Sequence, residues 1–148
     1  MNKIVVLSVL LSAFCFGQKA ANQDVQKPIQ NLFLAMKNAD AELLKSVFSE
    51  TAILQTVTKD GTVKTDAIPE FISSIGKAAK DDLDERITIE AIHIDGDLAS
   101  VFTPYQFYYK GKLLHCGANS FQLVKQNNSW KIQYIIDTRR KENCENGK

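Results

Sequence analysis

The chain of 148 residues carries 18 basic and 17 acidic residues, a formal charge of +1, and 45% hydrophobic residues. This near-neutral balance argues against a nucleic-acid partner, which would need a basic surface to offset phosphate charge, and against a polybasic membrane patch. The length suits one domain that can bury a core without staples.

The first seventeen residues have the pattern of a secretory signal peptide. Lys3 supplies a positive start, and a nearly unbroken apolar run follows over residues 4–16. That run is too short for a transmembrane helix, which needs about 20 residues. Small residues stand at the −3 and −1 positions of a cleavage site after Gly17. We therefore expect a secreted or periplasmic protein with no membrane span, one domain over residues 18–140, and a polar tail over residues 141–148.

The cysteines and histidines are few. Removal of the signal peptide leaves Cys116 and Cys144, for which one intramolecular bridge, an intermolecular bridge and two free thiols all remain open. Acylation of Cys15 would make a lipoprotein instead, although the bulky residue before it disfavours this. The histidines are His93 and His115, and no Cys-x-x-Cys occurs. We therefore predict no metal site and no cofactor.

Three helical patterns and a hairpin open the domain. Apolar residues recur at helical spacing from about residue 22 to Lys37, and Asp40 caps a second short helix. A hairpin follows around Lys59-Asp60-Gly61, whose strands are short enough to form a sheet edge. Thr65 or Asp66 then caps a third helix that Gly76 can end. We interpret Lys77–Glu85 as a solvated connection.

The remainder is typical of a four-stranded meander. Glycine or asparagine at Asp95-Gly96, Lys110-Gly111 and Asn127-Asn128 suits the positive φ of two-residue hairpins. Helices followed by antiparallel strands indicate an α+β protein. The predicted strands are Arg86–Ile94, Leu98–Tyr109, Leu113–Lys125 and Trp130–Thr138.

The order and length of these elements resemble the cone-shaped fold of the nuclear transport factor 2 superfamily, over roughly Gln23 to Arg140. The C-terminal strands resemble the "putative lumazine-binding" branch of this superfamily in particular. The matching residues are His115-Cys116-Gly117 through Phe121-Gln122-Leu123-Val124, then Trp130-Lys131-Ile132 and Ile136-Asp137-Thr138-Arg139. The resemblance implies a strongly curved, mainly antiparallel sheet wrapped around three N-terminal helices. It also implies a homodimer, as members often form. Ketosteroid isomerases, limonene-epoxide hydrolases and polyketide cyclases belong to this superfamily, so fold alone does not decide activity.

The turns predict a register, because paired residue numbers have a constant sum in a two-residue hairpin. Gln106 is then opposite His115, Phe102 opposite Asn119, and Phe121 opposite Tyr134. Alternation turns a polar cluster and nearby aromatic residues toward the helices, where an apolar concavity with a few polar groups suits a ligand. The predicted ligand-binding residues are His115, Asn119, Gln106, Tyr108, Phe102 and Tyr134.

The opposite face of the sheet has no helix left to cover it. In this register the outer face carries Tyr105, Phe107 and Cys116. Because exposed aromatic surface of this kind is usually covered, we predict a homodimer through the outer face. Asp137 also points outward in this register, and next to Arg139 and Arg140 it is most simply part of a surface charge pair. No carboxylate of the meander then points inward, so the acidic machinery of ketosteroid isomerases or limonene-epoxide hydrolases is not visible.

Three functions remain open. The first is an exported module that binds a small apolar or aromatic molecule between the helices and the sheet, without catalysis. The second is an isomerase, cyclase or hydrolase with His115 as general base, since imidazole titrates near neutrality. The third is a structural homodimer whose pocket is filled by its own side chains.

Overall fold

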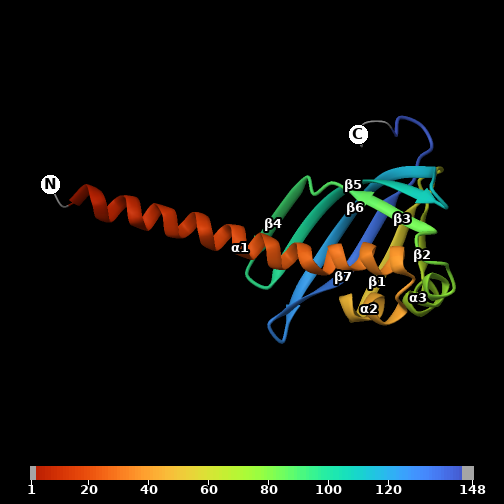
Figure 1. Ribbon diagram of the computed structural model, residues 1–148, viewed down its shortest axis with the longest axis horizontal. Helices are drawn as coiled ribbons and strands as arrows, with labels where there is room; N and C mark the ends of the chain where they lie inside the picture. Colours follow the sequence, from red (N-terminus) through yellow and green to blue (C-terminus); the bar gives the residue numbers. More distant parts are fainter. Residues whose placement is uncertain (1–2, 145–148) are drawn as a thin grey trace.

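The computed structural model describes residues 3–144 (Figure 1). The first two residues of the predicted signal peptide and the last four of the predicted tail lie outside the described residues. The elements alternate as two helices, two strands, one helix and five strands.

Helix α1 (Lys3–Asn38) is one long helix whose second half packs on the sheet, while its first half projects beyond the sheet (Figure 1). Within residues 21–38, where the side chains of α1 are described, the buried residues run from Val25 to Met36 with the predicted helical spacing. Within the part of the chain that the structure describes, no helix combines the length and the apolar character needed to cross a membrane.

The two shorter helices pack against each other and against β1. Helix α2 (Ala41–Val47) begins as predicted, because the Leu43 amide donates to Asp40 Oδ1 at 2.9 Å. Helix α3 (Ile68–Gly76) ends at the expected glycine but begins after Ala67, with a proline in its first turn. The predicted cap was wrong, because Thr65 and Asp66 remain within a strand and pair with β1.

One curved sheet of seven strands forms the other layer, in the order β2-β1-β7-β6-β5-β3, with β4 also paired to β5. Strands β1 and β7 are parallel, and the other pairs are antiparallel. The predicted α+β cone is therefore confirmed, with β2 at an edge. The strands are β1 (Phe48–Val57), β2 (Val63–Asp66), β3 (Leu83–Ile87), β4 (Ala91–Asp95), β5 (Leu98–Tyr109), β6 (Lys112–Gln126) and β7 (Ser129–Thr138).

The first predicted strand of the meander is two strands. Both β3 and β4 pair with β5, and residues 88–90 connect them. The solvated connection was predicted too long, because β3 already starts at Leu83 and places Glu85 opposite Phe107. The hairpin after β4 is shifted by one residue, since Asp95 pairs with Leu98 and Gly96, with φ of +58°, takes the first turn position.

Two β-bulges change the predicted register. The Lys110-Gly111 turn pairs Tyr108 with Leu113 as expected, but Leu114 is an extra residue, and Phe107 then pairs with His115. From the Asn127-Asn128 turn the predicted pairing is likewise correct as far as Leu123 and Ile132. Gln133 is then an extra residue on β7, and Gln122 pairs with Tyr134. Beyond each bulge the sum of paired numbers rises by one, which reverses the face that one strand presents relative to its neighbour.

The predicted pairings beyond the bulges were therefore wrong. Gln106 is opposite Cys116, Thr103 is opposite Asn119, and Phe121 is opposite Ile135. On β5 the odd-numbered residues face the helices, where Ala99, Val101, Thr103 and Tyr105 are all buried. The core lies between this face and α1, and it includes Ile29, Leu44, Phe121, Leu123 and Ile132.

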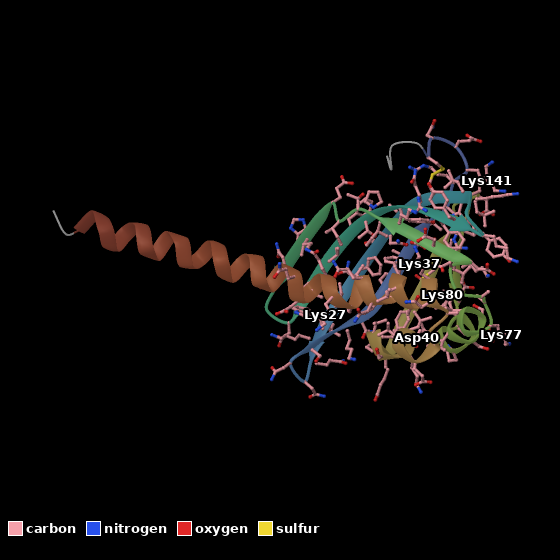
Figure 2. The ribbon with its side chains drawn as sticks, viewed as in Figure 1. Lys27, Lys37, Asp40, Lys77, Lys80 and Lys141 are labelled. Atoms are coloured by element: carbon pink, nitrogen blue, oxygen red, sulfur yellow. A yellow bond between two sulfur atoms is a disulfide. The ribbon has the colours of Figure 1, made fainter. Side chains whose placement is uncertain are left out.

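The C-terminal segment is tied to the outer face of β6. Cys116 and Cys144 form a disulfide, visible beside Lys141 in Figure 2, which settles the alternatives that the sequence left open. The backbones of Cys116 and Arg140 exchange two hydrogen bonds, of 2.9 and 2.8 Å. Both cysteines are buried as a result.

Candidate functional site

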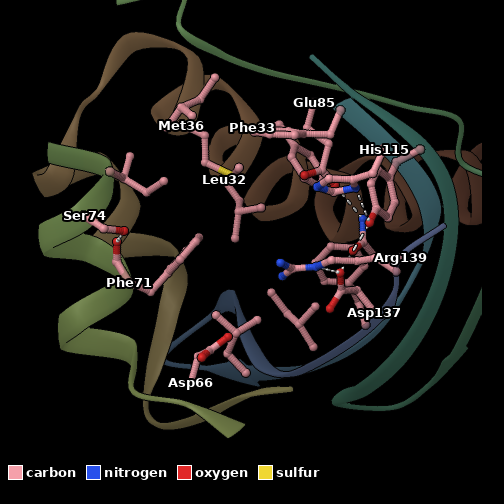
Figure 3. A pocket seen from close by; sticks show the side chains of 18 of the residues that line it. Leu32, Phe33, Met36, Asp66, Phe71, Ser74, Glu85, His115, Asp137 and Arg139 are labelled. Atoms are coloured by element: carbon pink, nitrogen blue, oxygen red, sulfur yellow. Dashed lines mark hydrogen bonds and ion pairs between the residues drawn. The ribbon is translucent and has the colours of Figure 1, made fainter. Parts of the chain in front are cut away.

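A cavity of about 410 Å³ lies between the helices and the inner face of the sheet (Figure 3). Side chains of α1 and α3 form one wall, and β3, β5, β6 and β7 form the other. Its size is within the range of sites for small organic molecules. The apolar lining includes Leu32, Phe33, Met36, Leu54, Phe71, Ile75, Leu83, Phe107, Phe121 and Ile135, and the polar lining includes Asp66, Glu70, Ser74, Glu85, Tyr105, His115, Asn119, Asp137 and Arg139.

Asp137 is the centre of the polar wall. Its Oδ2 accepts from Arg139 Nε at 2.8 Å, and its Oδ1 accepts from Thr56 Oγ1 at 2.5 Å. Arg139 also donates to Thr56 through Nη2 at 3.1 Å, so the three side chains form a closed set. Burial opposes the charge of Arg139, but the hydrogen bond and the charge of Asp137 outweigh it and raise the arginine pKa.

Tyr105 joins this carboxylate to His115. Its hydroxyl oxygen is 2.9 Å from the Thr138 carbonyl, 3.3 Å from Asp137 Oδ2 and 3.2 Å from His115 Nδ1. Because the hydroxyl has one proton and the first two partners only accept, the arrangement is satisfied when His115 donates from Nδ1. Burial, together with the Asp137 charge, raises the Tyr105 pKa, so the phenol stays neutral.

His115 is held between two aromatic rings. It stacks on Phe107 with ring centroids 4.9 Å apart and meets Tyr105 edge-on at 5.6 Å. Burial, with repulsion from Arg139, lowers the His115 pKa, which makes neutral imidazole the main form at neutral pH. The predicted general base is thus in the cavity, with one ring nitrogen already engaged.

Gly117 makes room for this arrangement. A Cβ at this position would lie 1.8 Å from the Thr138 carbonyl oxygen and 2.9 Å from the Tyr105 ring. Only a residue without a side chain permits that approach. The glycine therefore allows the carbonyl of Thr138 to reach the Tyr105 hydroxyl.

Glu85 and Asn119 form a second polar group in the cavity. Asn119 Nδ2 donates to Glu85 Oε1 at 2.9 Å and lies 3.4 Å from Thr103 Oγ1. Glu85 is partly exposed, and because it lines the cavity its exposed surface faces the cavity. Burial raises the Glu85 pKa from 4.5 to about 7, and the negative charge of Asp137 adds to this effect.

Two of the six predicted ligand-binding residues, His115 and Asn119, line the cavity. The other four lie on the outer face because of the Leu114 and Gln133 bulges. There Gln106 accepts from the Tyr108 hydroxyl and donates to the Cys144 carbonyl, the Tyr134 hydroxyl donates to Gln55, and Phe102 is 42% exposed.

The predicted dimer residues were also placed on the wrong face. Tyr105 and Phe107 line the cavity beneath the helices, and Cys116 is covered by the chain's own C-terminal segment. Asp137 is not a surface charge either, since it is 7% exposed and points inward.

Sequence reasoning missed Glu85, Asp137 and Arg139. Alternation of Leu83, Glu85 and Ile87 does carry a signal for Glu85, because extending the strand by three residues would have turned it inward. Asp137 carries no such signal, since the bulge that turns it inward is not marked by glycine or proline. Arg139 lies in the cavity because it forms an ion pair with Asp137, so its position could not be predicted without that of Asp137.

The cavity can therefore hold the apolar body of a ligand, and its polar side chains offer both hydrogen-bond donors and hydrogen-bond acceptors. Arg139 extends its guanidinium toward the open space (Figure 3), and Glu85 and Asn119 offer acceptors. Glu85 can also exchange a proton near neutral pH. Apolar walls with a few convergent polar groups are typical of small-molecule sites.

Comparisons with known proteins agree with this architecture. The model of a family described as "Putative lumazine-binding" matches residues 20–134. An NTF2-like protein of unknown function from Shewanella baltica superposes with a TM-score of 0.66 at 17% identity, over 82% of this chain and 94% of that one. One from Silicibacter pomeroyi gives 0.69 at 17% identity, over 83% and 98%. A protein of unknown function with a cystatin-like fold from Nostoc punctiforme gives 0.66 at 12% identity, over 82% and 92%. No curated protein sequence matches the chain.

Proposed function

The chain belongs to the "Putative lumazine-binding" family of NTF2-like proteins, and on that premise we propose that it is an exported domain that binds a small apolar or aromatic molecule in the cavity. The observation that carries the proposal is the cavity of about 410 Å³, which joins apolar walls to convergent hydrogen-bonding side chains. A purely structural pocket would be filled by its own side chains, whereas this one has room for a ligand.

Lumazine, named by the family, is a suitable first probe. It is a flat bicyclic dione with ring nitrogens, so it presents aromatic faces to Phe71 and Phe107 and both donors and acceptors at its edges. Carbonyl oxygens suit Arg139, and N–H groups suit Glu85 and Asn119.

The test combines a defined probe with the native ligand. Titration of lumazine fluorescence should saturate with the wild type, and native mass spectrometry of protein purified from its host should show a retained small molecule. Ser74→Trp on α3 should abolish binding because it puts a large ring at a position that lines the cavity. Its neighbour Ser73 is not among the lining residues, so Ser73→Trp is the matched control. Absence of both lumazine binding and a retained ligand would overturn the proposal.

Export is supported by two features. The Cys116–Cys144 disulfide suits an oxidising compartment. The buried residues Val25 to Met36 of α1 all lie after Gly17, so cleavage there would keep them in the mature chain. Mass analysis of the protein recovered from its host should give a chain that starts at Gln18, and an uncleaved chain would contradict this part of the proposal.

One observation favours a second candidate function, proton-transfer catalysis of the isomerase or cyclase kind. Glu85 has a pKa of about 7 inside an apolar cavity, which suits a general base better than the engaged His115. The assay is hydrogen–deuterium exchange at the α-carbon of 2-tetralone, an enolisable ketone, followed by NMR. Exchange no faster than with Glu85→Gln would remove this candidate.

We also propose a homodimer through the outer face, now with different residues. Leu98 and Phe102 on β5 and Ile53 on β1 are between 42% and 50% exposed, which a second sheet would cover. Sedimentation should give a dimer that Phe102→Glu converts to a monomer. A monomeric wild type at micromolar concentration would refute it.

A further inference from the structure

Two acceptor oxygens in the cavity lack a donor. Asn119 uses its amide nitrogen for Glu85 Oε1 and Thr103, which leaves its own oxygen free. Glu85 uses Oε1 for Asn119, which leaves Oε2 free. Among residues 21–144, whose side chains the structure describes, no hydrogen bond to either free oxygen is formed, although both side chains line the cavity. An acceptor pair in an apolar setting is best satisfied by a ligand that donates protons.

The charge of the lining points the same way. Four carboxyl groups line the cavity, on Asp66, Glu70, Glu85 and Asp137, against the single guanidinium of Arg139 within that lining. Arg139 is already committed to Asp137 and Thr56 through two hydrogen bonds. An anionic ligand would therefore approach an arginine whose charge is compensated, in a cavity with further carboxyls.

We infer that the ligand presents a cationic N–H donor to the free oxygens of Glu85 and Asn119, and that the cavity discriminates against carboxylates. The inference rests on the proposed function and specifies the class of its ligand. The apolar body then lies among the side chains of α1 and α3, whose wall carries Leu32, Met36 and Phe71 (Figure 3).

The protonation of Glu85 supports the inference. A cationic donor stabilises the ionised carboxylate, so an amine should bind more tightly as the pH rises past about 7, where Glu85 ionises. Several other titratable groups line the cavity around Glu85: Asp137 within β7, Arg139 directly after it, His115 on β6, Tyr105 on β5, Asp66 on β2 and Glu70 on α3. Lys37 of α1 is paired with Asp84. Of these, His115 has its pKa lowered, so it is already neutral across that range.

The experiment uses three probes with one aromatic body: 2-naphthylmethylamine, 2-naphthylmethanol and 2-naphthylacetate, titrated at pH 8 by calorimetry. We expect the amine to bind about tenfold more tightly than the alcohol, as a charge-assisted hydrogen bond allows, and the acetate to bind most weakly. Glu85→Gln should reduce the preference for the amine about tenfold. Glu90 is exposed on the connection after β3, so Glu90→Gln is the matched control and should leave the preference unchanged.

The outcomes separate the inference from the function on which it rests. Equal binding of the three probes, tighter binding of the acetate, no binding of the amine, or an amine preference that Glu85→Gln leaves intact would each overturn the inference. The proposed function itself fails only if lumazine and a host-derived ligand are absent from the cavity as well.

Discussion

Replacement of Glu85 by glutamine should stabilise the protein at alkaline pH and have a much smaller effect at acidic pH. The ionised carboxylate is costly because protein encloses it and one of its oxygens lacks a donor. Glutamine has the same shape and keeps an oxygen for the Asn119 amide. It removes the charge and with it the cost.

The size and direction of the effect follow from the two pKa values. The Glu85 pKa is 4.5 in the unfolded chain and about 7 in the folded protein, so the folded state holds the proton more tightly. The free energy of unfolding of the wild type therefore decreases as the pH rises from about 4.5 to about 7, and the full cost is reached above that range. This cost is up to roughly 3 kcal/mol at pH 8 and below about 1 kcal/mol at pH 5.

The assay is urea denaturation of wild type and Glu85→Gln at pH 5 and pH 8, followed by circular dichroism. The lowered pKa of His115 also makes stability depend on pH, with the opposite sign, because a proton added below pH 6.5 favours the unfolded chain. Both proteins contain His115, so its contribution cancels in the comparison. Glu90→Gln controls for the loss of an exposed negative charge.

The reasoning would be refuted by a difference in unfolding free energy between Glu85→Gln and wild type that is the same at pH 5 and pH 8. A constant difference would mean that the carboxyl titrates alike in both states. The cavity would then be hydrated well enough to solvate the charge, and the case for Glu85 as a recognition group would weaken.

Three further changes test the packing around the site. Cys144→Ser should lower the unfolding free energy by about 3.5 kcal/mol, as expected for opening a crosslink between residues 28 apart, and added reductant should then have no further effect on urea denaturation. Gly117→Ala should destabilise by roughly 3 kcal/mol because its Cβ meets the Thr138 carbonyl, whereas Gly76→Ala, whose nearest contact is 3.1 Å, should cost far less in thermal melts. Phe121→Ala should cost about 3–5 kcal/mol in urea denaturation because this ring is fully buried against α1, and a loss below about 1 kcal/mol would contradict that packing.

The residues that mark turns and helix ends were enough to predict most elements of the domain, although not the division of the first meander strand into β3 and β4. Asp40, the Lys110-Gly111 turn and the Asn127-Asn128 turn act through their own backbone and nearest neighbours, so their effect is visible in the local sequence. The strand Leu98–Tyr109 was predicted with its observed bounds for the same reason. The predicted cleavage site after Gly17 concerns processing of the chain and stays a prediction.

Which side chains meet in the cavity was only partly predictable. His115 and Asn119 were placed inside correctly, because alternation along β6 is regular between the two bulges. The positions of Gln106 and Tyr108 depended on the register between β5 and β6, which the extra residue Leu114 shifts by one. A shift of one residue exchanges the two faces of a strand, so a single unmarked bulge moved half of the predicted cluster outside.

The sequence by itself determined the α+β class, the order of the elements, and an inner face of apolar residues with a few polar ones. The tertiary structure alone decided that Asp137, Arg139 and Glu85 share that face with His115. The physical reason is that hydrophobic spacing and turn chemistry are local properties. The register between long strands is instead set by bulges such as Gln133, whose amide donates to the Thr51 carbonyl and accepts from Ser49, 84 residues earlier.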